Sequence, residues 1–220
     1  MREKRKIFLF VGTICTLTFV VWTILLQKID VQPLGVEGTM IGFATLNCWF
    51  HQLTGVHMSL YVITDWLGLV PIAVCLLFGV IGALQLIRRK KLFDVDYDIL
   101  CLGLYYMIVI AAYLIFEEIP INYRPILIAG NKEVSYPSST TLLVLCVMPT
   151  LVEQVTRRLK RKGVKEFVAI IAVGFSTFMV VGRLVSGVHW ITDIIGATLL
   201  STGLFSLYKA AVLQCNKKEQ

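Results

Sequence analysis

Charged residues are scarce in this 220-residue sequence, which carries 14 acidic and 21 basic side chains and is only 16% charged. A soluble domain of this length would be about one quarter charged. Hydrophobic residues make up 57% of the chain instead. They gather into runs of about 20, the length that a helix needs to cross a hydrocarbon core roughly 30 Å thick. The composition excludes an ordinary soluble domain and predicts an all-α, polytopic membrane protein.

Cysteine pairs at metal-site spacing are also missing. The six cysteines, at positions 15, 48, 75, 101, 146 and 215, include no Cys-x-x-Cys and mostly fall inside apolar runs. We interpret them as small core residues and expect neither a disulfide framework nor a metal site. The net charge is +7, but the sequence has no basic stripe interleaved with aromatic residues, so we do not expect nucleic acid as a partner.

Six apolar runs are long enough to cross a membrane. We expect helices over residues 7–27, 65–87, 97–116, 138–156, 167–185 and 190–212. The basic start resembles a signal peptide, but the length of the first run and the lack of a small-x-small cleavage site favour a retained helix. Residues 29–64 contain only a short apolar stretch, 40–53, and are predicted to form an interfacial segment. Asp65 is predicted to cap the second helix.

Basic residues are distributed unevenly between the ends of these helices. If both termini are cytoplasmic, 17 of the 21 basic residues fall on the cytoplasmic side, as the positive-inside rule expects. We interpret the tryptophans near predicted helix ends, Trp190 among them, as interfacial anchors. The basic residues that do not follow the rule are Lys28, Arg124, Lys132 and Arg183.

The turn between the last two helices carries the spacing R-x5-H-x3-D, formed by Arg183, His189 and Asp193. His189 and Asp193 share one helix face, and a carboxylate on one imidazole nitrogen makes the other a better nucleophile. Arg183 lies near the end of an apolar run, where a cation is costly and usually functional. Singly they would be a helix cap, an interfacial histidine and a snorkelling arginine. Together they predict a site that handles phosphate.

Two further polar segments fall on the same predicted membrane face. Pro137 followed by Ser138 predicts a helix start, whose free amides attract phosphate, although a plain N-cap is the alternative. Arg124 precedes a proline, so its backbone is predicted to be extended. Its guanidinium can bind phosphate at two points, unless it is simply a solvated loop residue.

The order RP, PS and R-x5-H-x3-D resembles the signature of the type 2 phosphatidic acid phosphatase (PAP2) superfamily of membrane lipid phosphatases. Arg124-Pro125 matches the RP motif, Pro137-Ser138 matches the start of the PSGH motif, and the third motif is matched in full. The resemblance covers about residues 97–213, which we expect to be the catalytic core of a single domain spanning residues 1–220. Residues 1–96 would supply the first two helices and the outer segment.

The resemblance implies a role for each matched residue. His189 would attack phosphorus and form a phosphohistidine, and Asp193 would orient it. Phosphoryl oxygens would be bound by Arg124, by Arg183 and by the amides near Ser138 and Ser139. The implied substrate is a lipid phosphate drawn from the membrane lipids, at the non-cytoplasmic face of a cell membrane. Neither a metal nor another cofactor is implied.

Three positions depart from the family signature. Glu117 stands at the family's lysine, Gly182 at the serine before the arginine, and Thr140 at the histidine that ends PSGH. That histidine is the family's general acid, and threonine cannot replace it near neutral pH. We therefore expect a preference for a lipid diphosphate such as polyprenyl diphosphate, whose leaving group is a weaker base. Phosphatidate and phosphatidylglycerophosphate are the alternatives, and Glu117 could be the acid if burial raises its pKa.

Three other functions compete with a phosphatase. A catalytically degenerate relative would bind lipid phosphates without turnover. A phosphotransferase would pass the phosphoryl group to an alcohol, and a small transporter or scaffold would do neither. The intact Arg183, His189 and Asp193 favour an enzyme, because a pure binder does not need a poised nucleophile.

Overall fold

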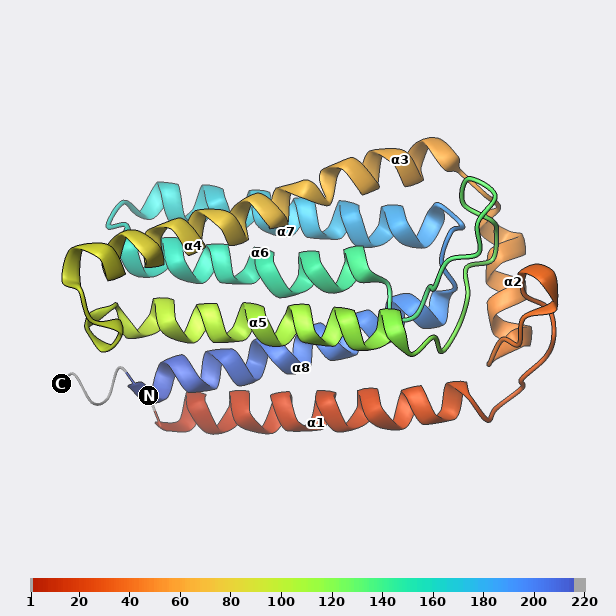
Figure 1. Ribbon diagram of the computed structural model, residues 1–220, viewed down its shortest axis with the longest axis horizontal. Helices are drawn as coiled ribbons and strands as arrows, with labels where there is room; N and C mark the ends of the chain where they lie inside the picture. Colours follow the sequence, from red (N-terminus) through yellow and green to blue (C-terminus); the bar gives the residue numbers. More distant parts are fainter. Residues whose placement is uncertain (1, 216–220) are drawn as a thin grey trace.

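The computed structural model describes residues 2–215 and is mainly helical (Figure 1). Six helical spans have the length and composition needed to cross a membrane, which confirms the predicted all-α bundle. They run along the long axis of the molecule. The spans are α1 (Arg2–Leu26), α3 joined to α4 (Met58–Arg89), α5 (Tyr97–Glu118), α6 (Ser139–Arg158), α7 (Lys162–Val185) and α8 (Ile191–Cys215).

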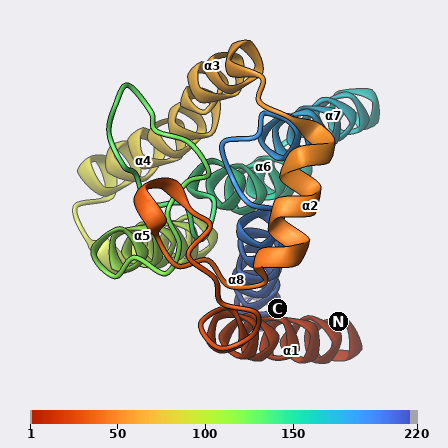
Figure 2. The same ribbon diagram turned by 90° about the vertical axis from the view of Figure 1, so that its right-hand side faces the viewer.

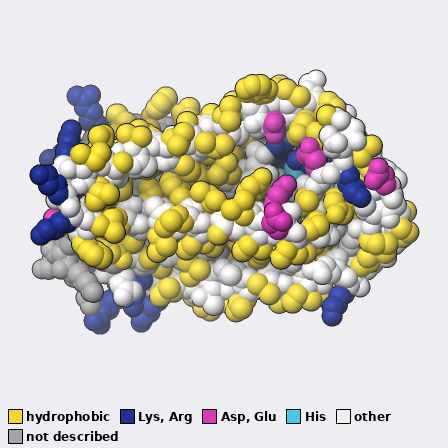
Figure 3. All heavy atoms as spheres, in the orientation of Figure 1, with side chains coloured by type: hydrophobic (Ala, Val, Ile, Leu, Met, Phe, Trp, Pro, Cys, Tyr) yellow, Lys and Arg dark blue, Asp and Glu magenta, His cyan; other side chains and the backbone are white. Residues whose placement is uncertain are grey.

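The beginning of α1 and the end of α8 lie at the same end of the bundle (Figure 1). Lys and Arg side chains gather at this end in Figure 3. Lys217 and Lys218, which belong to the predicted cytoplasmic set, lie outside the described residues, as does the side chain of Cys215. The α5–α6 and α7–α8 connections lie at the opposite end, so the motifs they carry share one face.

The link between the first two spans contains α2 (Ala44–Thr54), which lies across the end of the bundle (Figures 1 and 2). This is the predicted interfacial segment, but it ends earlier than expected. Residues 58–67 form α3 (Met58–Leu67), which continues into α4 (Leu69–Arg89) across a turn at Gly68. Short 3-10 helices occupy two connections, η1 (Val36–Gly38) and η2 (Leu92–Asp94).

Asp65 lies inside α3, so the prediction that it caps a helix was wrong. The polar residue before it, Thr64, does not break the helix. Its hydroxyl donates to the Leu60 carbonyl oxygen at 2.8 Å and is thereby satisfied within α3. The apolar run therefore continues through Thr64, and the second span begins about two turns earlier than the sequence pattern indicated.

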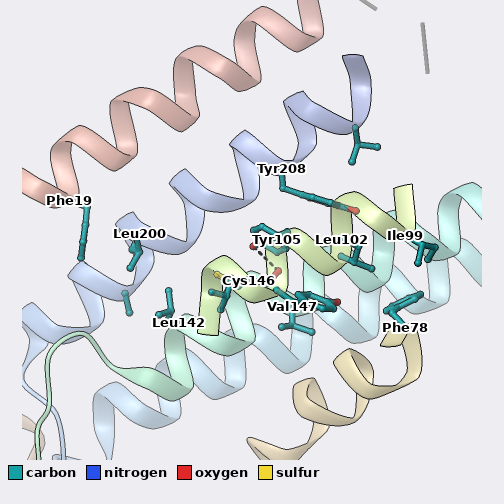
Figure 4. Packing of buried hydrophobic residues seen from close by; sticks show 14 of the residues in the cluster. Phe19, Phe78, Ile99, Leu102, Tyr105, Leu142, Cys146, Val147, Leu200 and Tyr208 are labelled. Atoms are coloured by element: carbon teal, nitrogen blue, oxygen red, sulfur yellow. Dashed lines mark hydrogen bonds between the residues drawn. The ribbon is translucent and has the colours of Figure 1, made fainter. Parts of the chain in front are cut away.

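The main core lies between α1, α4, α5, α6 and α8 (Figure 4). The Tyr105 hydroxyl donates to the Cys146 carbonyl oxygen at 3.1 Å, which satisfies the polar end of a buried ring. The five cysteines with described side chains are free thiols, and Cys146 is buried in this core. A smaller cluster joins α6 to α7 and contains Val144, Met148, Ala172 and Met179. Because α6 contributes to both clusters, its N-terminal end is firmly placed.

Candidate active site

The three predicted motifs meet at the end of the bundle opposite the start of α1. Arg124 lies in the α5–α6 connection, and Ser138 directly precedes α6. Arg183 occupies the last turn of α7, while His189 and Asp193 flank the start of α8. Figure 3 shows a hollow near this end, with histidine and basic side chains inside it and acidic side chains around it. The spacing of the motifs along the chain therefore becomes one site in space.

His189 and Asp193 are both buried, with 3% and 0% of their surface exposed. Asp193 Oδ2 lies 3.6 Å from His189 Nδ1 and accepts a 2.9 Å hydrogen bond from the backbone N–H of Trp190. A 3.6 Å contact is too long for a hydrogen bond, but such contacts tighten when substrate binds. Among the described residues, neither ring nitrogen of His189 makes a hydrogen bond of good geometry, although the Ser135 backbone lies close enough to act on the imidazole.

The charge state of His189 follows from its surroundings. Burial lowers the pKa of His189 well below its usual value, and the positive charges of Arg124 and Arg183 lower it further. The imidazole is therefore neutral at neutral pH. Only the neutral form has a lone pair with which to attack phosphorus.

Two buried arginines converge on the site. Arg183 is 1% exposed, and its Nη2 donates to Asp65 Oδ1 at 2.9 Å and to Thr140 Oγ1. Arg124 is 9% exposed, with Nε 3.1 Å from Glu133 Oε2. Within the described part of the chain, Arg183 Nε and Nη1 and Arg124 Nη1 are buried without a hydrogen-bond partner. Buried donors of this kind are costly unless a ligand satisfies them, and an oxyanion has acceptors that suit both side chains.

Ser138 and Ser139 mark the start of α6, as predicted. The Ser138 hydroxyl donates to Thr141 Oγ1 at 3.1 Å, and its backbone N–H donates to the Asp193 carbonyl oxygen at 3.3 Å. The Ser138 amide is thus engaged in tying α6 to α8 and is not free for phosphate. The amides of the first turn, from Ser139 on, have no acceptor within an α-helix, and such amides can bind an anion.

Two of the positions that depart from the family signature have distinct environments. Thr140 is buried and accepts a hydrogen bond from Arg183, so it holds an arginine where the family has its acid. Glu117 lines the same small pocket as His189, but it is exposed near the end of α5. The burial on which its expected role as a proton donor depended is therefore not found.

Two residues of α3 belong to the site although neither was predicted. The guanidinium carbons of Arg124 and Arg183 lie 5.5 and 5.0 Å from the centre of the Tyr61 ring. Asp65 forms the ion pair with Arg183, from which it is 118 residues distant in sequence. The only sequence trace of this arrangement is the four-residue spacing of Tyr61 and Asp65, which places them on one helix face.

Trp190 is buried and is not the predicted interfacial anchor. It is 3% exposed, and its Nε1–H donates to the Tyr123 carbonyl oxygen at 2.7 Å. This bond fixes the loop that carries Arg124 against the start of α8. The prediction failed because a tryptophan near a helix end gives the same sequence pattern whether its ring points to the membrane or to the interior.

An apolar groove of about 420 Å³ leads from the site to the membrane-facing surface. Two of its polar lining residues, Asp65 and Thr140, contact Arg183. A smaller pocket that contains His189 shares Ser139 with the groove. The apolar lining comes from α4, α5 and α6 and includes Leu69, Ile72, Val109, Ile110, Leu142 and Leu143. The groove therefore adjoins the pocket that His189 lines and opens between the spanning helices.

The family model of the PAP2 superfamily matches residues 106–217. The fold is similar to a crystal structure described as the first transmembrane PAP2 type phosphatidylglycerolphosphate phosphatase from Bacillus subtilis, with a TM-score of 0.58 and 21% sequence identity. This similarity covers 92% of the present chain and 96% of that chain. A search of curated protein sequences gave no match. Tyr61 and Asp65 precede the residues that the family model matches.

Proposed function

Because the chain belongs to the PAP2 superfamily, we propose that it is a membrane lipid phosphatase. The observation that carries this proposal is a buried, neutral His189 beside two buried arginines with unpartnered donors. A phosphoryl group suits these donors, because its oxygens can accept from both guanidinium groups while phosphorus faces the imidazole.

In the proposed reaction, His189 Nε2 attacks phosphorus and the bond between phosphorus and the leaving oxygen breaks, which gives a phosphohistidine. The electron pair of the broken bond stays on the leaving oxygen. Asp193 stabilises the positive charge that develops on the ring, while Arg124 and Arg183 stabilise the negative charge on the phosphoryl oxygens. Water then attacks phosphorus, which releases inorganic phosphate and returns His189 to its neutral form.

The leaving group determines which lipid suits this site. An alkoxide released from a lipid monophosphate needs a proton, and losing a general acid typically costs about 10²- to 10⁴-fold. Thr140 is occupied with Arg183, and Glu117 is exposed. A lipid phosphate released from a diphosphate is a weaker base and needs protonation less. We therefore favour a lipid diphosphate such as polyprenyl diphosphate over phosphatidate or phosphatidylglycerophosphate.

The groove supports a lipid substrate over a soluble phosphate ester. Its volume of about 420 Å³ lies within the range of small-molecule sites. Exposed side chains at its rim, such as Leu69 and Ile110, are large and apolar, and they lie on spanning helices. A hydrocarbon tail can occupy the groove while its phosphate reaches Arg183.

Phosphate release from a panel of lipid monophosphates and diphosphates tests the proposal, with His189→Ala as the inactive control. We expect release from diphosphates to be faster, and faster release from monophosphates would contradict the preference. Radioactive phosphate trapped on the wild type but not on His189→Ala separates an enzyme from a protein that only binds lipid phosphates. Added alcohol acceptors separate hydrolysis from phosphoryl transfer.

We also propose that the site faces the non-cytoplasmic side, because Lys and Arg gather at the other end of the bundle. Asn131 is exposed in the loop at the site end and can carry a label. A membrane-impermeant thiol reagent should modify Asn131→Cys in intact cells beyond the level seen with the unaltered chain, which has six cysteines of its own. Modification only after the cells are broken would show that the site faces the cytoplasm.

A further inference from the structure

We propose that Tyr61 of α3 is a positioning residue that holds Arg124 and Arg183 together for one phosphoryl group, with Asp65 as the counter-ion of Arg183. The inference rests on the proposed function of the site. Because Tyr61 and Asp65 lie outside the residues matched by the family model, membership of the family does not account for either of them.

Two buried positive charges repel each other, and each has lost part of its hydration. Arg124 and Arg183 are both at least nine-tenths buried, and both act electrostatically on the same imidazole. The Tyr61 ring lies 5.5 and 5.0 Å from their guanidinium carbons. The negative face of an aromatic ring attracts cations, most strongly where water is excluded. One ring therefore offsets part of the repulsion and gives both cations a common surface.

Arg183 is held by contacts that leave part of its guanidinium free. Its Nη2 is taken by Asp65 and Thr140, and Tyr61 lies against the group. Its Nε and Nη1 are buried and have no hydrogen-bond partner among the described residues. The side chain is therefore oriented before substrate arrives, and donors remain for the anion. Preorganised donors contribute more to catalysis than donors that must first be ordered.

The close packing of α3 against α7 explains why glycine stands at position 182. A Cβ added at Gly182, where the family has serine, would lie 2.7 Å from Thr64 Cγ2. The absence of that side chain lets Thr64 approach α7. Tyr61, Thr64 and Asp65 are spaced by three and four residues, so they share the face of α3 that meets Arg183.

Matched variants separate the effect of the aromatic ring at position 61 from the effect of side-chain size. Tyr61→Phe keeps the ring, whereas Tyr61→Leu fills the space without a π face. We expect Tyr61→Leu to bind inorganic vanadate, a tetrahedral oxyanion, about 10-fold more weakly, and Tyr61→Phe to stay within about 2-fold of the wild type. Binding is read as the vanadate-dependent rise in Tm of the purified full-length protein in detergent. With lipid substrate, Tyr61→Leu should raise KM more than it lowers kcat.

Equal vanadate binding by the wild type and Tyr61→Leu would overturn the inference, as would an equal loss in Tyr61→Phe and Tyr61→Leu. If Tyr61→Leu lowers the Tm without vanadate, Tyr61→Met replaces it with a more adaptable apolar side chain and the same expectation. A wild type that binds vanadate but releases phosphate from no lipid would sink the proposed function, while the ring test would still decide the role of Tyr61. A wild type that does not bind vanadate would overturn the inference itself.

Discussion

We expect His189 to control the acid side of the pH profile. Its pKa lies well below the usual value because of burial first and then the charges of Arg124 and Arg183. The neutral imidazole therefore persists as the pH falls through about 6.5, where an exposed histidine takes up its proton. We expect kcat/KM to stay level through that pH and to decline only at a lower one. A decline centred near 6.5 in a steady-state pH series would show that His189 titrates like an exposed residue.

Thr140 offers a test of what replaced the family's acid. Thr140→Val keeps the shape but removes the oxygen that accepts from Arg183, whereas Thr140→Ser keeps that oxygen. If Thr140 serves only to hold Arg183, Thr140→Val should lower kcat/KM about 10-fold for monophosphate and diphosphate lipids alike, and Thr140→Ser should retain most activity. A loss confined to monophosphates would instead identify the hydroxyl as a proton donor to the leaving group.

At the scale of elements, one substitution should disrupt the contact between α3 and α7, and a second should restore it. Gly182→Ala places a methyl 2.7 Å from Thr64 Cγ2 and should cost about 1–3 kcal/mol of stability while displacing Tyr61 and Asp65. Thr64→Ser removes that Cγ2 but keeps the hydroxyl that donates to Leu60. The double variant should therefore recover both the Tm and kcat/KM. If Gly182→Ala alone left both the Tm and kcat/KM unchanged, neither stability nor activity would depend on the close packing of α3 against α7.

The spans and the motif residues could be predicted because each depends on a constraint that the sequence displays. Bilayer thickness sets the length of apolar runs, and an even number of crossings brings the loops carrying Arg124 and His189 to one face. Tyr61 has no such signal. Its proposed role depends on how α3 packs against α7. The mixture of polar and apolar residues in this ten-residue helix does not reveal that packing. Trp190 was missed for a related reason, because its ring direction is fixed by Tyr123 in a distant loop.

At the scale of the whole molecule, the groove should distinguish long lipids from water-soluble esters. Ile72 lines the groove and is 43% exposed, while Leu76, one turn along α4, is 66% exposed and is not part of the lining. We expect Ile72→Trp to lower kcat/KM for a long-chain lipid phosphate about 10-fold, with little change for a short-chain phosphate that does not fill the groove. Leu76→Trp is the matched control. If Ile72→Trp and Leu76→Trp lowered kcat/KM for the long-chain lipid phosphate equally, the tail would not bind in the groove.

Because the groove opens toward the membrane, the substrate concentration that matters is the concentration within the membrane. A lipid that arrives within the plane of the membrane is encountered per unit of area, so its mole fraction among neighbouring lipids sets the rate. Adding substrate and inert lipid in the same proportion raises the amount per litre of suspension but leaves turnover per protein unchanged. Diluting the substrate with detergent inside mixed micelles slows turnover even when the amount per litre is constant. For the proposed lipid phosphatase we accordingly expect a Michaelis constant that is a surface composition, expressed in mole per cent.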